Sequence, residues 1–191
     1  MALASLLGHA WANHRRETPV TTQAILRDTD LPLGAGQREI AGTQLQGTLV
    51  DLVDLALIGK QAIWNVESAL SSPVSRELNK LVERWRTLAD DVAERAAIIG
   101  VVPDGRARTI AGASEIESLP ARVLSESVLA ETIADRLVEV AARVRDRLRR
   151  VAVRDPVTED LLHLVAATLE EHVWIVRNQR RRSCHVMQMV S

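Results

Sequence analysis

Apolar residues recur at three- and four-residue steps along most of this chain, a spacing that is typical of amphipathic helices. Pro73 follows a serine and is typical of a first helical position, whereas Gly100 is typical of a residue that ends a helix. No strand-like alternation of note occurs. The pattern therefore predicts an all-α protein with four long helices, over residues 37–66, 73–99, 125–153 (or 127–153) and 155–179.

A long connection separates the second and third predicted helices. Pro103, Asp104-Gly105 and Gly112 mark turns within residues 101–124, and a short helix is predicted from Ser114 to Leu119. Some four-helix bundles use such a crossover to reverse direction. The predicted organisation is a flexible N-terminal arm (1–36), the bundle (37–179) and a basic C-terminal tail (180–191).

Composition narrows this picture. The 191 residues are enough for one domain, and the core must be largely aliphatic because the only aromatic residues are four Trp. A formal net charge of -1 gives the whole chain no electrostatic attraction to nucleic acid. The lone Cys184 fits a reducing compartment, and no apolar run is long enough to span a membrane. A cytoplasmic protein is expected.

The second predicted helix carries an acidic pair. Asp90 and Glu94 are four residues apart, so both carboxylates lie on one helix face. Carboxylates that face the interior of a helix bundle commonly hold iron or manganese. Ion pairs with Arg86, Arg95 or Lys60 would explain the same residues without a metal, and the sequence leaves both readings open.

Two further clusters each have two readings. The arginines within residues 143–150 suit a solvated or subunit-contacting helix end, which is favoured here over a phosphate site. Soft ligands in the tail suit Cu(I) or a haem edge, although a disordered tail that happens to hold them is the favoured explanation. These soft ligands are Cys184, His185, Met187 and Met189.

Five motifs in this order resemble those of one family. They are KQAIWNV (60–66), LADDVAERAAIIG (88–100), PDGRARTIAGASEIESLP (103–120), DPVTEDLL (155–162) and LEEHVWIVRNQ (169–179). Together they resemble the Dps proteins, mini-ferritins that form DNA-protecting, iron-storing shells in starved bacteria. The resemblance covers about residues 44–178. It implies a ferritin-like four-helix bundle that assembles as a hollow dodecamer.

The resemblance also implies a metal site shared between two-fold-related subunits. In the family, one subunit gives two His and an Asp, the other gives an Asp and a Glu, and hydrogen peroxide oxidises the bound ferrous iron. Asp90 and Glu94 match the acidic half. Ile63, Ser75 and Asn79 stand at the three positions of the other half. Iron binding is therefore expected to be weakened, and ferroxidase activity to be largely lost.

Two more groups follow from the resemblance. The family lines its three-fold pores with carboxylates near the start of the last helix, although the helix dipole alone also favours acids there. Members also often bind DNA through basic tails. The corresponding residues are Asp155, Glu159 and Asp160 for the pore, and Arg177, Arg180, Arg181 and Arg182 for DNA.

The implied function is that of a stress-protection shell protein, associating with DNA or sequestering iron, with its usual ferroxidase site largely lost. One alternative is an active ferroxidase and iron-storage protein that uses a modified or relocated site. Another is an accessory subunit whose acidic half completes the site of a paralogue. DNA binding would place the protein at the nucleoid.

Overall fold

The computed structural model describes residues 31, 33–67, 73–152 and 155–190, with side chains as far as Asn178. Most of the predicted N-terminal arm therefore lies outside the described residues. Within them the chain is helical, and the only β-type pairing is an isolated bridge between Val66 and Leu124. The helices are α1 (Ala35–Asn65), α2 (Pro73–Ile98), α3 (Ala107–Ala113), α4 (Glu126–Val151) and α5 (Pro156–Val190).

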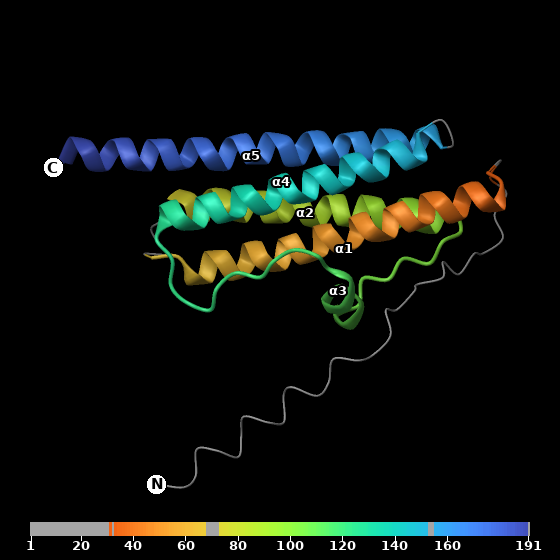
Figure 1. Ribbon diagram of the computed structural model, residues 1–191, viewed down its shortest axis with the longest axis horizontal. Helices are drawn as coiled ribbons and strands as arrows, with labels where there is room; N and C mark the ends of the chain where they lie inside the picture. The colour runs from red at the N-terminus through yellow and green to blue at the C-terminus, as the bar shows by residue number, and fades with distance from the viewer. Residues whose placement is uncertain (1–30, 32, 68–72, 153–154, 191) are drawn as a thin grey trace, which may run out of the picture.

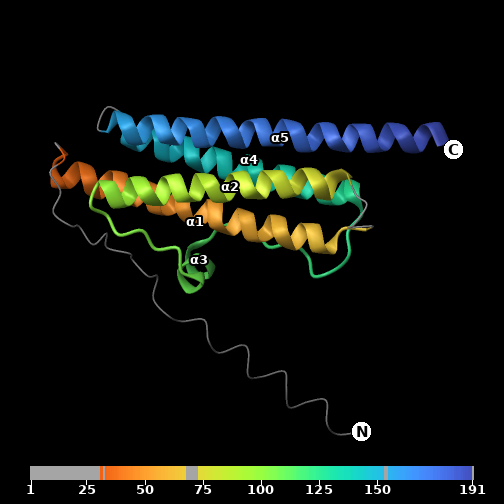
Figure 2. The ribbon, with the colours of Figure 1, turned by 180° about the vertical axis from the view of Figure 1, so that it is seen from behind.

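The four long helices form one bundle made of two antiparallel hairpins (Figure 1). One hairpin pairs α1 with α2, and the other pairs α4 with α5. The connection between them carries α3 and runs beside α1, as both views show (Figures 1 and 2). This confirms the predicted all-α bundle with its crossover. None of the described helices is both long and apolar enough to cross a lipid bilayer.

The end of α2 shows why the sequence signal at Gly100 was informative. Gly100 has a φ of 79°, a left-handed conformation that side chains rarely adopt. Its N–H donates to the carbonyl of Ala97 at 3.0 Å, and the N–H of Val101 donates to that of Ala96 at 2.9 Å. These bonds satisfy carbonyls that the helix end would otherwise leave unpaired.

Two predicted boundaries are wrong. The short helix spans residues 107–113 rather than 114–119, because the Ser114 hydroxyl bonds to Asp54 and accepts the N–H of Ile116, which closes a turn. The last helix continues to Val190 instead of ending near Gln179. No Gly or Pro follows Pro156, so the sequence contains no strong stop signal there.

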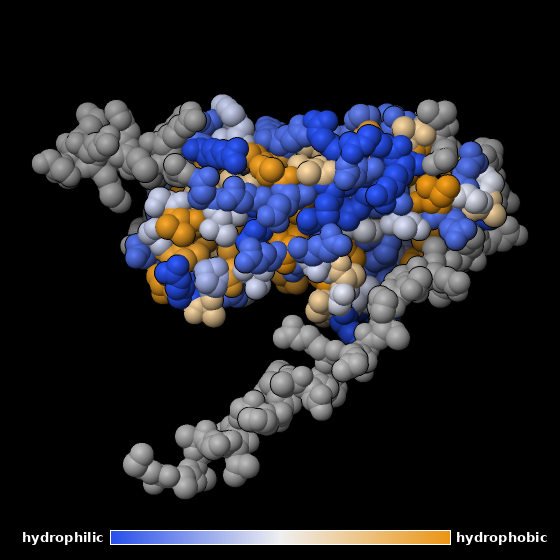
Figure 3. All heavy atoms as spheres, viewed as in Figure 1, coloured by the Kyte–Doolittle hydropathy of each residue, from blue (hydrophilic) through white to orange (hydrophobic). Residues whose placement is uncertain are grey.

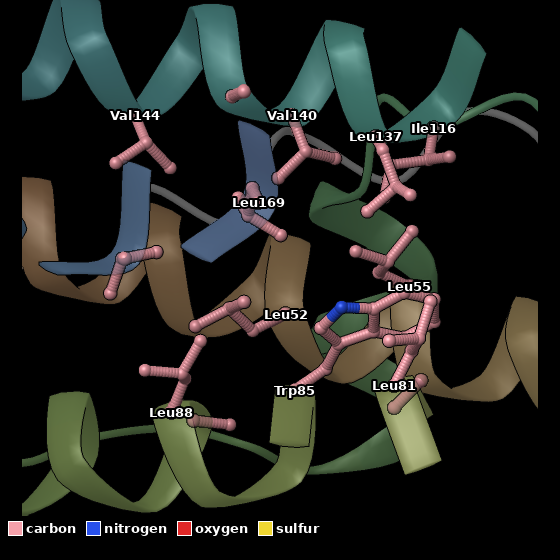
Figure 4. Close-up of a cluster of buried hydrophobic side chains, with 14 of the residues drawn as sticks. Leu52, Leu55, Leu81, Trp85, Leu88, Ile116, Leu137, Val140, Val144 and Leu169 are labelled. Atoms are coloured by element: carbon pink, nitrogen blue, oxygen red, sulfur yellow. The ribbon is translucent and has the colours of Figure 1, made fainter. Parts of the chain in front are cut away.

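The core is aliphatic, as predicted, with one aromatic side chain at its centre (Figure 4). Trp85 is fully buried, and its indole N–H donates to His172 Nδ1 at 2.9 Å. Burial lowers the pKa of His172, which keeps the imidazole neutral and able to accept this bond. Around Trp85 lie Leu52 and Leu55 of α1, Leu81 and Leu88 of α2, Leu137, Val140 and Val144 of α4, and Leu169 of α5.

Close contact between α1 and α2 depends on Gly59. A Cβ atom at this position would lie 2.5 Å from Val82 Cγ2 and 2.8 Å from Trp85 Cζ3. Such distances are well inside van der Waals contact. The glycine therefore lets the two helices approach, and it fixes the register in which α1 and α2 present their outer faces.

Candidate metal centre

Asp90 and Glu94 lie on the exposed side of α2. Among the described residues, neither carboxylate makes a hydrogen bond or an ion pair. In the same part of the chain, no three His, Cys, Asp or Glu side chains come together in a way that could hold a metal ion. The acidic pair is therefore an isolated, solvent-facing pair within one protomer.

The ion-pair reading of this acidic pair is wrong for the protomer, because each proposed cation has another partner. Arg86 binds a neighbouring glutamate on its own helix instead. Arg95 pairs with a residue at the start of α5, and Lys60 bonds to a residue of α2. The contacts are Arg86–Glu83 at 3.2 Å, Arg95–Asp155 at 2.8 Å and Lys60–Asn79 at 3.0 Å.

The three positions of the other predicted half-site lie close to the junction of α1 and α2. Ile63 belongs to the hydrophobic core and exposes 9% of its surface, and Ser75 is also buried, with 3% exposed. Asn79 Nδ2 donates to the carbonyl oxygen of Ser75 at 3.1 Å. The structure therefore joins Ser75 and Asn79, while Ile63 contributes only packing.

Lys60, which the sequence suggests only as a counter-charge for the acidic pair, lies against Asn79 instead. Its ammonium Nζ donates to Asn79 Oδ1 at 3.0 Å, so a fixed positive charge lies at one of the three ligand positions. Like unit charges 4 Å apart repel by roughly 4 kcal/mol at the effective dielectric of a protein surface. A divalent cation bound near Asn79 would face at least that repulsion.

In this protomer, the carboxylate of Asp155 is already bound and is not available to line a pore. It is buried, with 2% of its surface exposed, and it accepts two hydrogen bonds from Arg95 Nη2 at 2.8 and 2.9 Å. It also accepts from the hydroxyl and the N–H of Thr158, which caps the start of α5. Burial alone would raise the pKa of Asp155, but the bonds from Thr158 and Arg95 outweigh it and lower this pKa.

The other two residues predicted to line a pore, Glu159 and Asp160, are more exposed than Asp155. Glu159 is half-buried and lies 3.8 Å from His163 Nε2, whereas Asp160 is exposed. Both carboxylates are open to solvent to some degree, so a role in a pore stays a prediction for this pair. Nothing in the sequence distinguishes Asp155 from these two residues, because its partner Arg95 lies on another helix.

The arginine run on α4 is largely neutralised by carboxylates. Hydrophilic residues gather over the C-terminal half of α4 and the adjoining part of α5 (Figure 3). Arg143 and Arg147 both pair with buried Asp51 of α1, at 2.9 and 2.6 Å. Arg145 pairs with Glu170 of α5 and Arg149 with Asp146. These pairs favour the solvated-surface interpretation over a phosphate site.

The predicted DNA-binding residues can be placed only in part. Arg177 is exposed on α5, with its guanidinium 3.7 Å from Asp135. The backbone of residues 180–182 continues the same helix. The side chains of Arg180, Arg181 and Arg182, and of the soft-ligand cluster at residues 184–189, lie outside the described side chains.

Comparison with known proteins gives consistent matches. A family model for the ferritin-like domain matches residues 42–183. DNA protection during starvation protein 2 of Deinococcus radiodurans is 35% identical over 153 residues, which cover 79% of this chain and 63% of that protein. The fine tangled pili major subunit of Haemophilus ducreyi is 30% identical, over 70% of each protein. A crystal structure of a Dps from Deinococcus radiodurans is 32% identical, with a TM-score of 0.68, over 75% of this chain and 87% of that one.

The bundle, its crossover and the family match define a ferritin-like protein. Within that class, the chain belongs to the Dps family of mini-ferritins. The resemblance inferred from the five motifs is thereby confirmed.

Proposed function

We propose that this protein forms a Dps-like dodecameric shell for stress protection whose inter-subunit ferroxidase site is largely lost. The observation that carries the proposal is the hydrogen bond between Lys60 and Asn79. It holds an ammonium group against Asn79, the residue at the position where the family resemblance implies a carboxylate ligand. The shell then acts through physical sequestration and DNA association rather than through rapid oxidation of iron at this site.

The donor set supports this proposal on chemical grounds. Ferrous iron favours imidazole and carboxylate ligands. Ile63 offers no donor atom, and the hydroxyl of Ser75 and the amide of Asn79 are neutral and weak. Asp90 and Glu94 are carboxylates that face solvent, and two such groups with water would hold a divalent cation only loosely. The residues present therefore do not fit a pair of oxidisable iron ions.

Anaerobic titration of the purified assembly with Fe(II), followed by hydrogen peroxide, tests the loss of the site. We expect no stoichiometric binding and an oxidation rate equal to that of a protein-free control, read as absorbance of the ferric product. Glu94→Gln serves as the matched variant, and it should leave both readings unchanged. Stoichiometric binding and rapid oxidation that Glu94→Gln abolishes would instead support an active ferroxidase with a modified site.

DNA association is the second part of the proposed role. Arg177 and the arginines at positions 180–182 would be repeated on every subunit of a shell, and weak contacts that are repeated reinforce one another. We expect gel retardation at about 50 mM salt that is lost by about 200 mM, because phosphate contacts release counterions. Replacing Arg180, Arg181 and Arg182 with Gln should abolish it. A lack of retardation by the wild type even at low salt would remove DNA from the proposal.

An accessory subunit remains a second candidate, favoured by one observation. Asp90 and Glu94 are exposed and have no partner among the described residues, so they are available to complete a site on another chain. Purification solely as a homo-oligomer from cells that also express a paralogue would contradict this candidate.

A further inference from the structure

Trp85 of α2 and His172 of α5 form a polar contact inside a largely aliphatic core. The indole Nε1–H donates to His172 Nδ1 at 2.9 Å. Trp85 is fully buried, and His172 leaves 6% of its surface exposed. Because α2 belongs to one antiparallel hairpin and α5 to the other, this hydrogen bond joins the two halves of the bundle.

The direction of this bond fixes the protonation state of His172. An indole N–H can only donate, so Nδ1 of His172 must accept, and the neutral ring carries its proton on Nε2. A second proton would go to Nδ1 and would face the N–H of Trp85. Two donors cannot bond to each other, and the ring would also carry a charge inside the core. The bond therefore exists only while the imidazole is neutral.

The charged groups that act on His172 come from α2 and from its own helix. Glu171 and Glu77 favour protonation and Arg84 opposes it, but burial has the largest effect and lowers the pKa of His172. The labelled side chains that α1 and α4 place around Trp85 are aliphatic (Figure 4). The unfolded chain binds this proton near the ordinary histidine pKa of about 6.5. The stability that neutral His172 contributes is therefore complete above about pH 6.5 and declines as pH falls below it.

A second link lies on the same boundary between α2 and α5 and responds differently to acid. Arg95 of α2 bonds to Thr158 at 3.0 Å and to Asp155 at 2.8 Å, at the start of α5. Folding lowers the pKa of Asp155, so this ion pair stays charged down to pH values below about 3.9. Thr158 lies about 21 Å along α5 from His172, at 1.5 Å per residue. Mild acid therefore removes one link between α2 and α5 and leaves the other in place.

We propose that the Trp85–His172 hydrogen bond is an acid-sensitive latch between the two hairpins, which releases the middle of α5 from α2 when His172 is protonated. This inference goes beyond the proposed function, because the latch needs neither iron nor DNA. The start of α5 stays attached through Arg95, so the opening is local. The bundle loosens around His172 between about pH 6.5 and pH 5.

Hydrogen–deuterium exchange of the purified assembly, in the presence of a chelator, tests the latch. We expect the protection of amides in residues 168–176 to fall at least about tenfold between pH 7.5 and pH 5, after correction for the intrinsic exchange rate. Residues 158–164, near Asp155, should change by less than about twofold. This comparison uses the unaltered protein, so it gives an answer even if a substitution at His172 prevents folding.

Two substitutions on α5 separate the titration of His172 from a merely structural role. His172→Gln offers an amide oxygen that can accept the indole N–H but cannot be protonated in this range. It should keep the protection of residues 168–176 nearly constant from pH 7.5 to pH 5, whatever its absolute value. His163→Gln is the matched control, because His163 is on the same helix with 61% of its side chain exposed, 3.8 Å from Glu159. It should keep the acid response of the wild type.

Each other outcome would overturn the latch. Equal loss of protection in both segments of α5 would mean that acid loosens the whole bundle instead of one link. An unchanged acid response in His172→Gln, or its loss in His163→Gln, would assign the titration to another group. A wild type whose residues 168–176 stay protected at pH 5 would show that the bundle does not depend on the bond.

Discussion

Replacing Asp155 with alanine is expected to lower the free energy of unfolding by about 3–5 kcal/mol, because it leaves Arg95 as an unpaired, largely buried charge. Arg95 exposes 13% of its side chain and Asp155 exposes 3%. The same carboxylate also caps α5 through Thr158, so the start of that helix loses its acceptor. Urea unfolding at fixed protein concentration, followed by circular dichroism, measures the change.

The control for this prediction is Asp160→Ala, on an exposed carboxylate of the same helix, which should change stability by no more than about 0.5 kcal/mol.

The pH dependence of stability gives an independent check. The pKa of Asp155 is lowered by folding, so its contribution is complete above the ordinary aspartate pKa of about 3.9 and is lost as pH falls through the lower folded value. The gap between wild type and Asp155→Ala should therefore narrow in acid. A constant gap, or one below about 1 kcal/mol at neutral pH, would contradict the role assigned to this pair.

Most of the fold was predictable because its signals are local. Each of these signals, such as the apolar stripe, Pro73 and Gly100, depends only on nearby residues. Together they predict the bounds of three of the four long helices to within a few residues. The sequence does not predict the end of α5, because nothing in residues 157–190 stops a helix and the cluster of arginines suggests a tail. Ser114 was expected to begin a helix, but its hydroxyl is engaged by Asp54, which lies 60 residues earlier in the chain.

The candidate site was less predictable because its decisive contacts are distant in sequence. The motif identified Asp90, Glu94 and the three altered ligand positions. It did not show that Lys60 reaches Asn79, since that contact depends on the register of the α1–α2 hairpin, which Gly59 helps to set. The sequence alone does not tell which carboxylates are free to bind a metal and which already pair with a distant residue, as Asp155 does with Arg95.

The position of Lys60 adds a second reason to expect weak iron binding, beside the altered ligands. An altered ligand set alone is consistent with a weakened site that still binds iron. The lysine ammonium held against Asn79 adds a repulsive charge, and among the described residues the exposed acidic pair elsewhere on the hairpin has no counter-charge.

Replacing Trp85 with alanine is expected to destabilise the protein by about 3–5 kcal/mol, because the indole is fully buried where all four long helices meet (Figure 4). The substitution removes the packing that Gly59 makes possible and leaves His172 Nδ1 without its donor. Trp85→Phe keeps most of the volume but not the hydrogen bond, so we expect a smaller loss of about 1–2 kcal/mol. Thermal and urea unfolding of the three proteins measure both effects.

Trp174 provides the matched control, because it is the same residue type on α5 with 68% of its surface exposed. Trp174→Ala should change the free energy of unfolding by no more than about 0.5 kcal/mol. If Trp85→Ala lowered the free energy of unfolding as little as this control, the prediction would be wrong, and the surrounding side chains would have to fill the cavity left by the indole. The chain has no Phe or Tyr, and the two other described tryptophans, Trp64 and Trp174, are exposed, so none of them can fill that space and the large value is expected.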